Sequence, residues 1–218
     1  MGMRYPFPAG ARLRVLTASG NVTVTAEERL DLDVDAGGRS PHVDSDDGGR
    51  SVQIRSRSGS LDIRCPRLTD ISVGTISGRV QLIGEFGSVK VSAVSGHIEV
   101  DSASGDLDVR SVSGHLTVNT CGARCQLNTT SGHIVLGHAG GPARASTMSG
   151  QVEVGTSGQG DVELRSISGK VLVRVPQGKH PRARLHSLSG RIRCDCPQGA
   201  DFDLKATTVS GSIEVTPR

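Results

Sequence analysis

The sequence predicts an all-β fold, a single-stranded parallel β-solenoid of about ten turns, from three observations. Ten Ser-Gly pairs, one for each turn, are followed by apolar residues at the second and fourth positions after the glycine. From Gly59 onward, the glycines of this set are 18 to 21 residues apart. Aromatic residues make up only 2% of the chain, which suits a thin core of Val, Ile and Leu between close strands. Such a repeat buries its apolar face only by stacking on its neighbours.

The apolar positions define the expected strands. The second residue after each glycine is Val22, Leu61, Val80, Ile98, Leu116, Ile134, Val152, Val171, Ile192 or Ile213. The fourth residue is also apolar in every copy, and mostly polar residues stand between the two. This alternation is typical of β-strands. Turns stacked at about 4.8 Å would form a rod of roughly 45 to 50 Å.

Most central turns divide into halves of nine residues, which predicts two strands per turn. Gly87, Gly105 and Gly160 each lead a second pair of apolar residues. We expect a third inward column just before the Ser-Gly pair: Ile76, Val94, Val112, Met148, Ile167, Leu188 and Val209. Cys125 and Cys194 also fall in inward columns, where cysteine acts as a small hydrophobic residue.

We expect one continuous domain over residues 1–218, because a single turn is not stable alone. Residues 1–57 would form irregular N-terminal turns and a cap, and residues 58–218 the regular repeats. Tyr5 and Phe7 are available to cover the open end of the stack. The Gly- and Asp-rich segment 36–50 is typical of a turn or loop.

The Ser-Gly pairs are interpreted as corners, because every turn needs a residue that accepts positive φ and a hydroxyl that bonds the backbone. The alternative is a ladder of hydroxyls for sugar or ice. The central structural turns are Ser95, Gly96, Ser113, Gly114, Ser131, Gly132, Ser149 and Gly150.

His97, His115 and His133 each follow a corner glycine, so they should stack on the outer surface. Neighbouring imidazoles could share a zinc ion, but no Asp, Glu or Cys stands in the same column. We therefore interpret the column as a solvated ladder and expect no metal and no cofactor.

The sequence contains no phosphate-binding loop and no activated-nucleophile motif, so we expect no enzymatic activity. A polysaccharide-cleaving β-helix remains an alternative, and its candidate residues lie near two Pro-Gln-Gly loops: Lys179, His180, Asp201 and Asp203. The net charge of +3 is small. The basic residues lack aromatic partners on which bases could stack, so we expect no specific nucleic-acid binding.

Charge differs between the two halves of the chain. Residues 27–47 contain eight acidic side chains, whereas residues 165–193 contain eight basic ones and no acidic one. This asymmetry favours head-to-tail or end-to-end self-association, because a solenoid end exposes unpaired strand edges. The first residues lack the apolar core of a signal peptide, and no run is long enough for a transmembrane segment. With five cysteines and no disulfide framework, the sequence predicts a cytoplasmic protein; the cell surface, reached by an unrecognised route, is the alternative.

Three runs carry a further signal: Asp62-Ile-Arg-Cys-Pro66, Val73-Gly-Thr-Ile-Ser-Gly-Arg-Val80 and Phe86-Gly-Ser-Val-Lys-Val91. With these runs the chain resembles a bacterial family described as "putative adhesins" of unknown function, and in particular its actinobacterial cytoplasmic members. The resemblance covers nearly the whole chain. It implies a single-stranded right-handed β-helix and brings no catalytic residues.

These observations together predict a non-catalytic structural or interaction scaffold that binds a protein partner, or a second copy, through its faces or ends. An exported adhesin or carbohydrate-binding protein is the first alternative. A β-helix enzyme acting on polysaccharide is the second.

Overall fold

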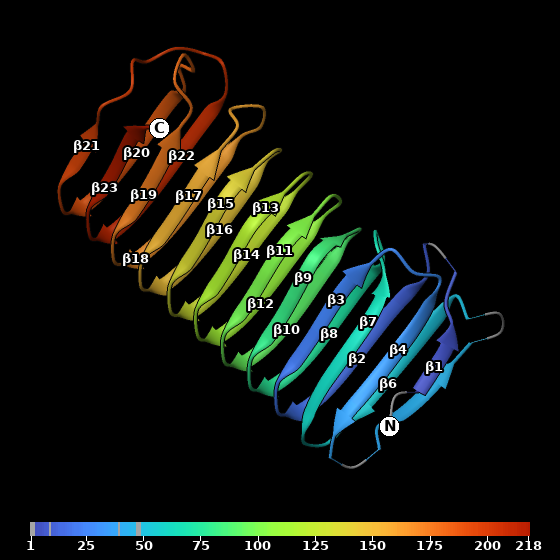
Figure 1. Ribbon diagram of the computed structural model, residues 1–218. Coiled ribbons are helices and arrows are strands. Elements are labelled where there is room, and N and C mark those ends of the chain that lie inside the picture. Colours follow the sequence, from blue (N-terminus) through green and yellow to red (C-terminus); the bar gives the residue numbers. More distant parts are fainter. Residues whose placement is uncertain (1–2, 9, 39, 47–48) are drawn as a thin grey trace.

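The computed structural model describes residues 3–8, 10–38, 40–46 and 49–218, and arranges them as two facing β-sheets (Figure 1). Among these residues there is no helix. Ten two-stranded coils, each with one strand in each sheet, stack in parallel along the molecule. The prediction of an all-β parallel solenoid with about ten turns is confirmed.

Sheet A has twelve strands. In spatial order they are β1 (Met3–Pro6), β4 (Asp31–Gly37), β7 (Ser60–Pro66), β3 (Val22–Glu27), β9 (Val80–Phe86), β11 (Ile98–Ala103), β13 (Leu116–Cys121), β15 (Ile134–Ala139), β17 (Val152–Thr156), β19 (Val171–Val175), β23 (Ile213–Pro217) and β21 (Ile192–Cys194).

Sheet B has eleven strands. From the opposite end they are β20 (Arg182–Ser189), β22 (Asp203–Ser210), β18 (Val162–Ser168), β16 (Ala143–Ser149), β14 (Cys125–Ser131), β12 (Leu107–Ser113), β10 (Val89–Ser95), β8 (Asp70–Ser77), β2 (Arg12–Ser19), β6 (Ser51–Ser56) and β5 (His42–Ser45).

The coils do not follow chain order at either end of the stack. The coil β2–β3 lies between β6–β7 and β8–β9, so Val24 pairs with both Ile63 and Leu82. The coil β22–β23 lies between β18–β19 and β20–β21, so Val215 pairs with both Val173 and Cys194. The segment 1–57, expected to be irregular, therefore contributes one regular coil to the inside of the stack.

The placement of the last two coils does not follow from a difference in their apolar content. The inward positions of β22 and β23 include Leu204, Ile213 and Val215, which are fully buried. In register with them, the terminal strands carry Ala183 opposite Leu204, Leu185 opposite Ala206, Ile192 opposite Ile213 and Cys194 opposite Val215. The two coils therefore have similar inner residues, and they differ in that β22 and β23 are paired on both edges.

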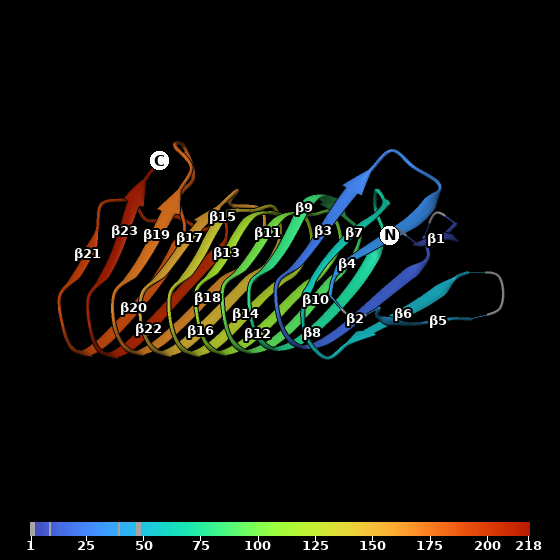
Figure 2. The same cartoon turned by 60° about the horizontal axis from the view of Figure 1, so that its bottom comes forward.

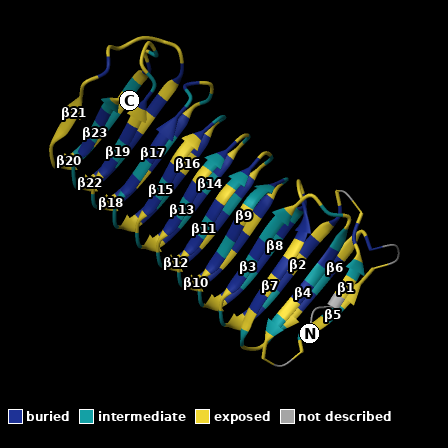
Figure 3. Cartoon of the chain, viewed as in Figure 1, coloured by how far each residue is buried: buried dark blue, intermediate teal, exposed yellow. Residues whose placement is uncertain are grey.

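The inward columns predicted from the repeat form the core. The second and fourth residues after the corner glycine are buried in every coil except the outermost, β20–β21. Buried residues alternate with more exposed ones along most strands (Figure 3). Both sheets contribute one face to this thin aliphatic layer.

The corner glycines form a continuous column. Gly114 has φ of 143° and Gly132 has φ of 145°. A Cβ on Gly114 would overlap the carbonyl oxygen of Gly96 in the neighbouring coil. Inside the corner, Thr75 Oγ1 donates to the Ser77 carbonyl at 3.2 Å and Thr147 Oγ1 to the Ser149 carbonyl at 3.1 Å. Glycine is required here both by conformation and by the close approach of two backbones.

The third inward column predicted from the sequence is wrong. Its residues face solvent, with Ile76 58%, Val94 46% and Leu188 76% exposed. Strand alternation explains the difference: Ala93 occupies the inner position, so Val94, the next residue, points outward. The exposed column forms an apolar stripe beside the corner: Ile76, Val94, Val112, Met148, Ile167, Leu188 and Val209.

The N-terminal end of the stack is closed by antiparallel strands. β4 pairs with β7 and with β1, and β5 pairs with β6 (Figure 2). Phe7 is 1% exposed and Tyr5 packs against the core, so the predicted covering role of both side chains is confirmed. The segment 36–50, predicted as a turn or loop, includes the short strand β5.

Candidate functional site

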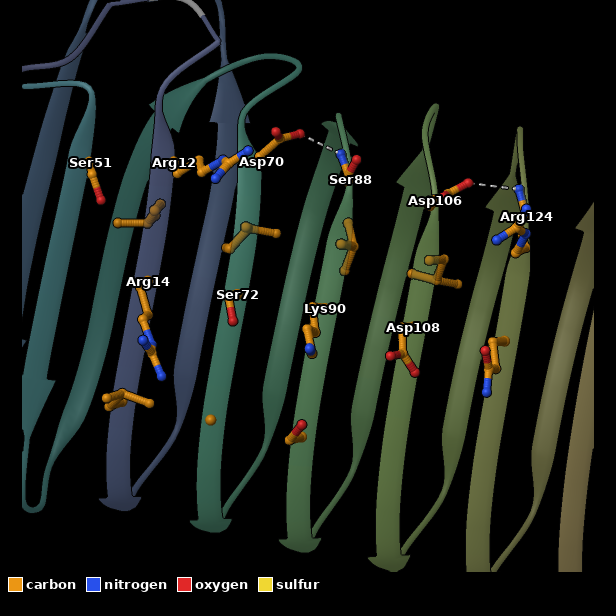
Figure 4. Close-up of a pocket in the computed structure, with 18 residues that line it drawn as sticks. Arg12, Arg14, Ser51, Asp70, Ser72, Ser88, Lys90, Asp106, Asp108 and Arg124 are labelled. Carbon is orange, nitrogen blue, oxygen red and sulfur yellow. Dashed lines mark hydrogen bonds between the residues drawn. The ribbon is translucent and has the colours of Figure 1, made fainter.

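A depression of about 910 Å³ lies on the outer face of sheet B and crosses β2, β8, β10, β12 and β14 (Figure 4). Side chains on this face come from the polar positions that alternate with the core columns. Arg14, Ser72, Lys90 and Asp108 occupy one row across four neighbouring strands. Arg12 and Asp70 lie opposite each other in the next row.

Small residues make the floor of the depression. Ser72, Gly74 and Ser92 lie among longer side chains that form its rim. Leu16 leans over Gly74, because a Cβ on Gly74 would lie 2.9 Å from Leu16 Cδ2. The hollow therefore results from the alternation of short and long side chains between neighbouring coils.

The carboxylates of the depression already have partners. Asp70 Oδ1 accepts a hydrogen bond from the Ser88 backbone N–H at 2.8 Å. Asp106 Oδ1 accepts one from the Arg124 backbone N–H at 3.3 Å. Asp108 forms an ion pair with Arg110 at 3.0 Å. These contacts use part of the negative charge on this face.

Four cationic side chains of the depression have no such partner. Within the described part of the chain, no side-chain hydrogen bond or ion pair is formed by Arg12, Arg14, Lys90 or Arg124. All four are exposed to solvent. The depression therefore presents free positive charge above a floor of serine hydroxyls.

Sequence reasoning missed this site because it stacked the coils in chain order. Arg12 and Arg14 belong to β2, which the insertion of the first coil places beside β8. The alternation of Arg12, Leu13, Arg14 and Val15 shows that both arginines lie on an outer face, but it gives no information on the neighbouring coil.

The predicted corner residues lie along one edge of the rod. The rings of His97 and His115 meet edge-on at 4.7 Å between centroids, and those of His115 and His133 stack at 4.9 Å. His133 Nδ1 accepts a hydrogen bond from the Gln151 N–H at 3.1 Å. Among the residues with described positions, no three His, Cys, Asp or Glu side chains are arranged to hold a metal ion.

The candidates near the Pro-Gln-Gly loops are only partly brought together. The His180 N–H donates to Asp201 Oδ2 at 2.8 Å. Asp203 instead lies 3.9 Å from Arg182 on the neighbouring strand. The Lys179 N–H donates to the Pro176 carbonyl at 3.2 Å. These contacts stabilise the loops, and they do not place two carboxylates on a common cleft.

Most cysteines are buried as the repeat predicts. Burial raises the pKa of Cys65 to about 11. A hydrogen bond with Cys121, together with burial, raises the pKa of Cys125. Cys194 lies in the predicted inward column, in register with Val215, but its coil is the last in the stack and no further coil covers it, so its predicted burial is wrong.

The C-terminal end of the stack is open. β20 pairs only with β22, and β21 only with β23, among the strands that the structure describes. Ala183 and Leu185 are half-buried, and Ile192 is 42% exposed. This terminal coil, residues 182–194, exposes both strand edges and the inner side of a coil.

Ion pairs reduce the charge asymmetry seen in the sequence. Lys170 lies 2.6 Å from Glu214 and Arg174 lies 2.7 Å from Glu153. At the other end, Arg29 contacts Glu27, Asp31 and Asp33. Lys170 and Arg174 meet carboxylates on neighbouring rungs, so much of the basic run is neutralised locally, whereas Arg29 offsets only part of the acidic run.

The stacked coils and the column of corner glycines agree with a family comparison. The family model described as Toastrack DUF4097 matches residues 8–157. This chain belongs to the Toastrack family. The match covers the closed end and the central coils of the Toastrack solenoid.

A solved structure described as a "putative adhesin", from Bacteroides fragilis, shares the fold of this chain. Its TM-score is 0.57 at 11% identity, and the match covers 99% of this chain and 96% of that chain. Another "putative adhesin", from Parabacteroides merdae, has a TM-score of 0.47 at 11% identity, with 99% and 95% covered. No curated protein matches the chain significantly. The described residues contain no helix long and apolar enough to cross a membrane.

Proposed function

We propose that this Toastrack chain is a non-catalytic interaction scaffold that binds a second copy of itself through the terminal coil. The observation that carries the proposal is the difference between the two ends. Phe7 and three antiparallel strands close one end. At the other end, Leu185 and Ile192 lie at least partly exposed beside strand edges without partners in the described chain.

A second copy of the chain suits the terminal coil, because each copy presents the same apolar surface and the same free strand edges. Two exposed apolar coil ends can cover each other, and two free edges can exchange backbone hydrogen bonds. A contact of the same surface on both partners has two-fold symmetry and stops at a dimer. The closed N-terminal end supports such a dimer over an open head-to-tail chain, as do the local ion pairs, which weaken long-range attraction between the ends.

Light scattering across a concentration series tests the proposal. We expect the mass to rise to twice the 22.7 kDa of one chain and no further. High salt should not dissociate the dimer, because apolar contact is not screened as exposed charges are. A mass that grows without limit, or that falls to one chain in high salt, would support head-to-tail association instead.

A matched pair of variants locates the contact. Leu185→Arg places a charge on the inner side of the terminal coil and should leave the protein monomeric. Leu188→Arg changes the same residue type on the same strand, but its side chain is already 76% exposed on the outer face. That control should dimerise normally. A wild-type chain that stays monomeric at millimolar concentration sinks the proposal.

The cytoplasmic location is part of this proposal, and an exported adhesin is the alternative. The names of the structural relatives describe those proteins, and at 11% identity they bear on fold alone. Fractionation of the native cells separates the two: a scaffold of this kind is expected in the soluble intracellular fraction, whereas an adhesin is expected at the cell surface.

A further inference from the structure

We propose that the depression on sheet B binds an acidic polysaccharide, with uronate carboxylates held by Arg12, Arg14 and Lys90. This site lies on a side face of the rod and is independent of the terminal coil. It exists because the first coil is inserted between the second and third, which brings Arg12 and Arg14 beside β8.

Charge decides the type of ligand. The three carboxylates of the depression have partners, whereas its four cationic side chains do not, among the residues described. An anion bound here meets positive charge without displacing an existing ion pair. Arginine binds carboxylates through two parallel N–H donors, which adds direction to the attraction.

The spacing of the cations suits a polymer with repeated carboxylates. Arg14 and Lys90 are two coils apart in one row with Ser72 between them, a separation of about 10 Å. Arg12 and Arg14 are two residues apart on one strand, about 7 Å. A carboxylate above Ser72 lies within reach of both long side chains, and Arg12 is available to a second carboxylate.

The surroundings favour a polysaccharide over a peptide. β2, β8, β10 and β12 each have both edges paired inside sheet B, so a peptide cannot add to them as a further strand. The floor and rim instead offer hydroxyl and amide groups of Ser72, Ser88, Ser92 and Gln126, which can bond ring hydroxyls. None of the residues that line the depression is aromatic, so binding should depend on charge and weaken with salt.

Calorimetric titration of the full chain with tetragalacturonate tests the site, with a neutral tetrasaccharide of galactose as the comparison. We expect binding of the acidic oligomer only. Arg14→Gln and Lys90→Gln should each weaken it about tenfold, the loss expected for one charge-assisted hydrogen bond. Arg79→Gln is the matched control, because it removes the same charge from the same region of the rod at a corner away from the depression. That variant should bind within twofold of the wild type.

Three outcomes would overturn the proposal. If Arg79→Gln weakened tetragalacturonate binding equally, the effect of the substitutions would come from net charge and not from the depression. Equally tight binding of tetraglutamate, with the same dependence on Arg14 and Lys90, would make the ligand an acidic peptide. An absence of binding at millimolar tetragalacturonate in low salt would show that the depression is not a site for this class of ligand.

Discussion

The two ends of the solenoid are built from similar coils and finish differently. At the N-terminal end, Phe7 fills the end of the core and antiparallel strands cover the last coil. At the C-terminal end, Ile192 on the inner side of the terminal coil is 42% exposed, and no strand of the described chain covers that coil. The comparison teaches that repetition makes the rod but does not close it. Closure needs a change of strand direction and a large side chain.

Gly20 and Gly190 offer the strongest test of this difference. Both belong to the corner column, and a Cβ on either would overlap a carbonyl oxygen of the neighbouring coil. Gly20 is enclosed by coils on both sides and has φ of 114°, so Gly20→Ala should cost more than about 4 kcal/mol. Gly190→Ala should cost much less, because the outermost coil can move away. Equal losses in urea unfolding would show that the terminal coil is held as firmly as the others.

The next largest effect concerns the side chains at each end. Phe7→Ala should lower the free energy of unfolding by about 3–5 kcal/mol, because it leaves a cavity in a closed core. Leu185→Ala should cost less than about 1 kcal/mol in the monomer, since that side chain is already partly hydrated. Chemical denaturation at low protein concentration measures both. A small loss for Phe7→Ala would contradict the role given to the cap.

The free energy of unfolding should depend on pH through the buried thiol of Cys65, near the closed end. The pKa of Cys65 is raised to about 11 by burial, so the folded state keeps the neutral thiol where the unfolded chain ionises. This stabilisation is complete below the unfolded pKa of about 8.5 and is lost as pH rises toward 11, by an amount of the order of 3 kcal/mol. Unfolding experiments between pH 8 and 11 should show the decline. Cys65→Val, an apolar replacement in the same column, should reduce the slope.

The smallest expected effect concerns the reactivity of the cysteine thiols and leaves the stability of the fold unchanged. Cys194 on the terminal coil is exposed, whereas Cys65, Cys121, Cys125 and Cys196 are buried. One thiol per native chain should react rapidly with a thiol reagent, and Cys194→Ser should remove that fast phase without changing stability. If the fast phase survives in Cys194→Ser, another part of the stack opens more readily than the end.

Much of the fold follows from the sequence, because residues such as Ile98 and Val100 repeat in one register along the chain. The outward position of Val94 was also accessible, since counting by twos from Val91 places Ala93 inside. The coil order was not accessible. Every coil carries the same pattern and can stack on any other. Even the last two coils have similar inner residues, with Leu204 and Ala206 in β22 opposite Ala183 and Leu185 in β20. The depression could not be predicted for the same reason, because Arg14 and Lys90 share one row only when β2 is inserted beside β8.

The insertion of β22–β23 has a consequence for how the protein is made. β20 and β21 contact the rest of the stack through β22 and β23, so residues 182–194 have no neighbouring coil until residues 203–217 have been synthesised. The rod therefore cannot be completed rung by rung as the chain leaves the ribosome. Its last two rungs must form together, after translation of both segments, and until then an apolar strand edge stays open to other nascent chains.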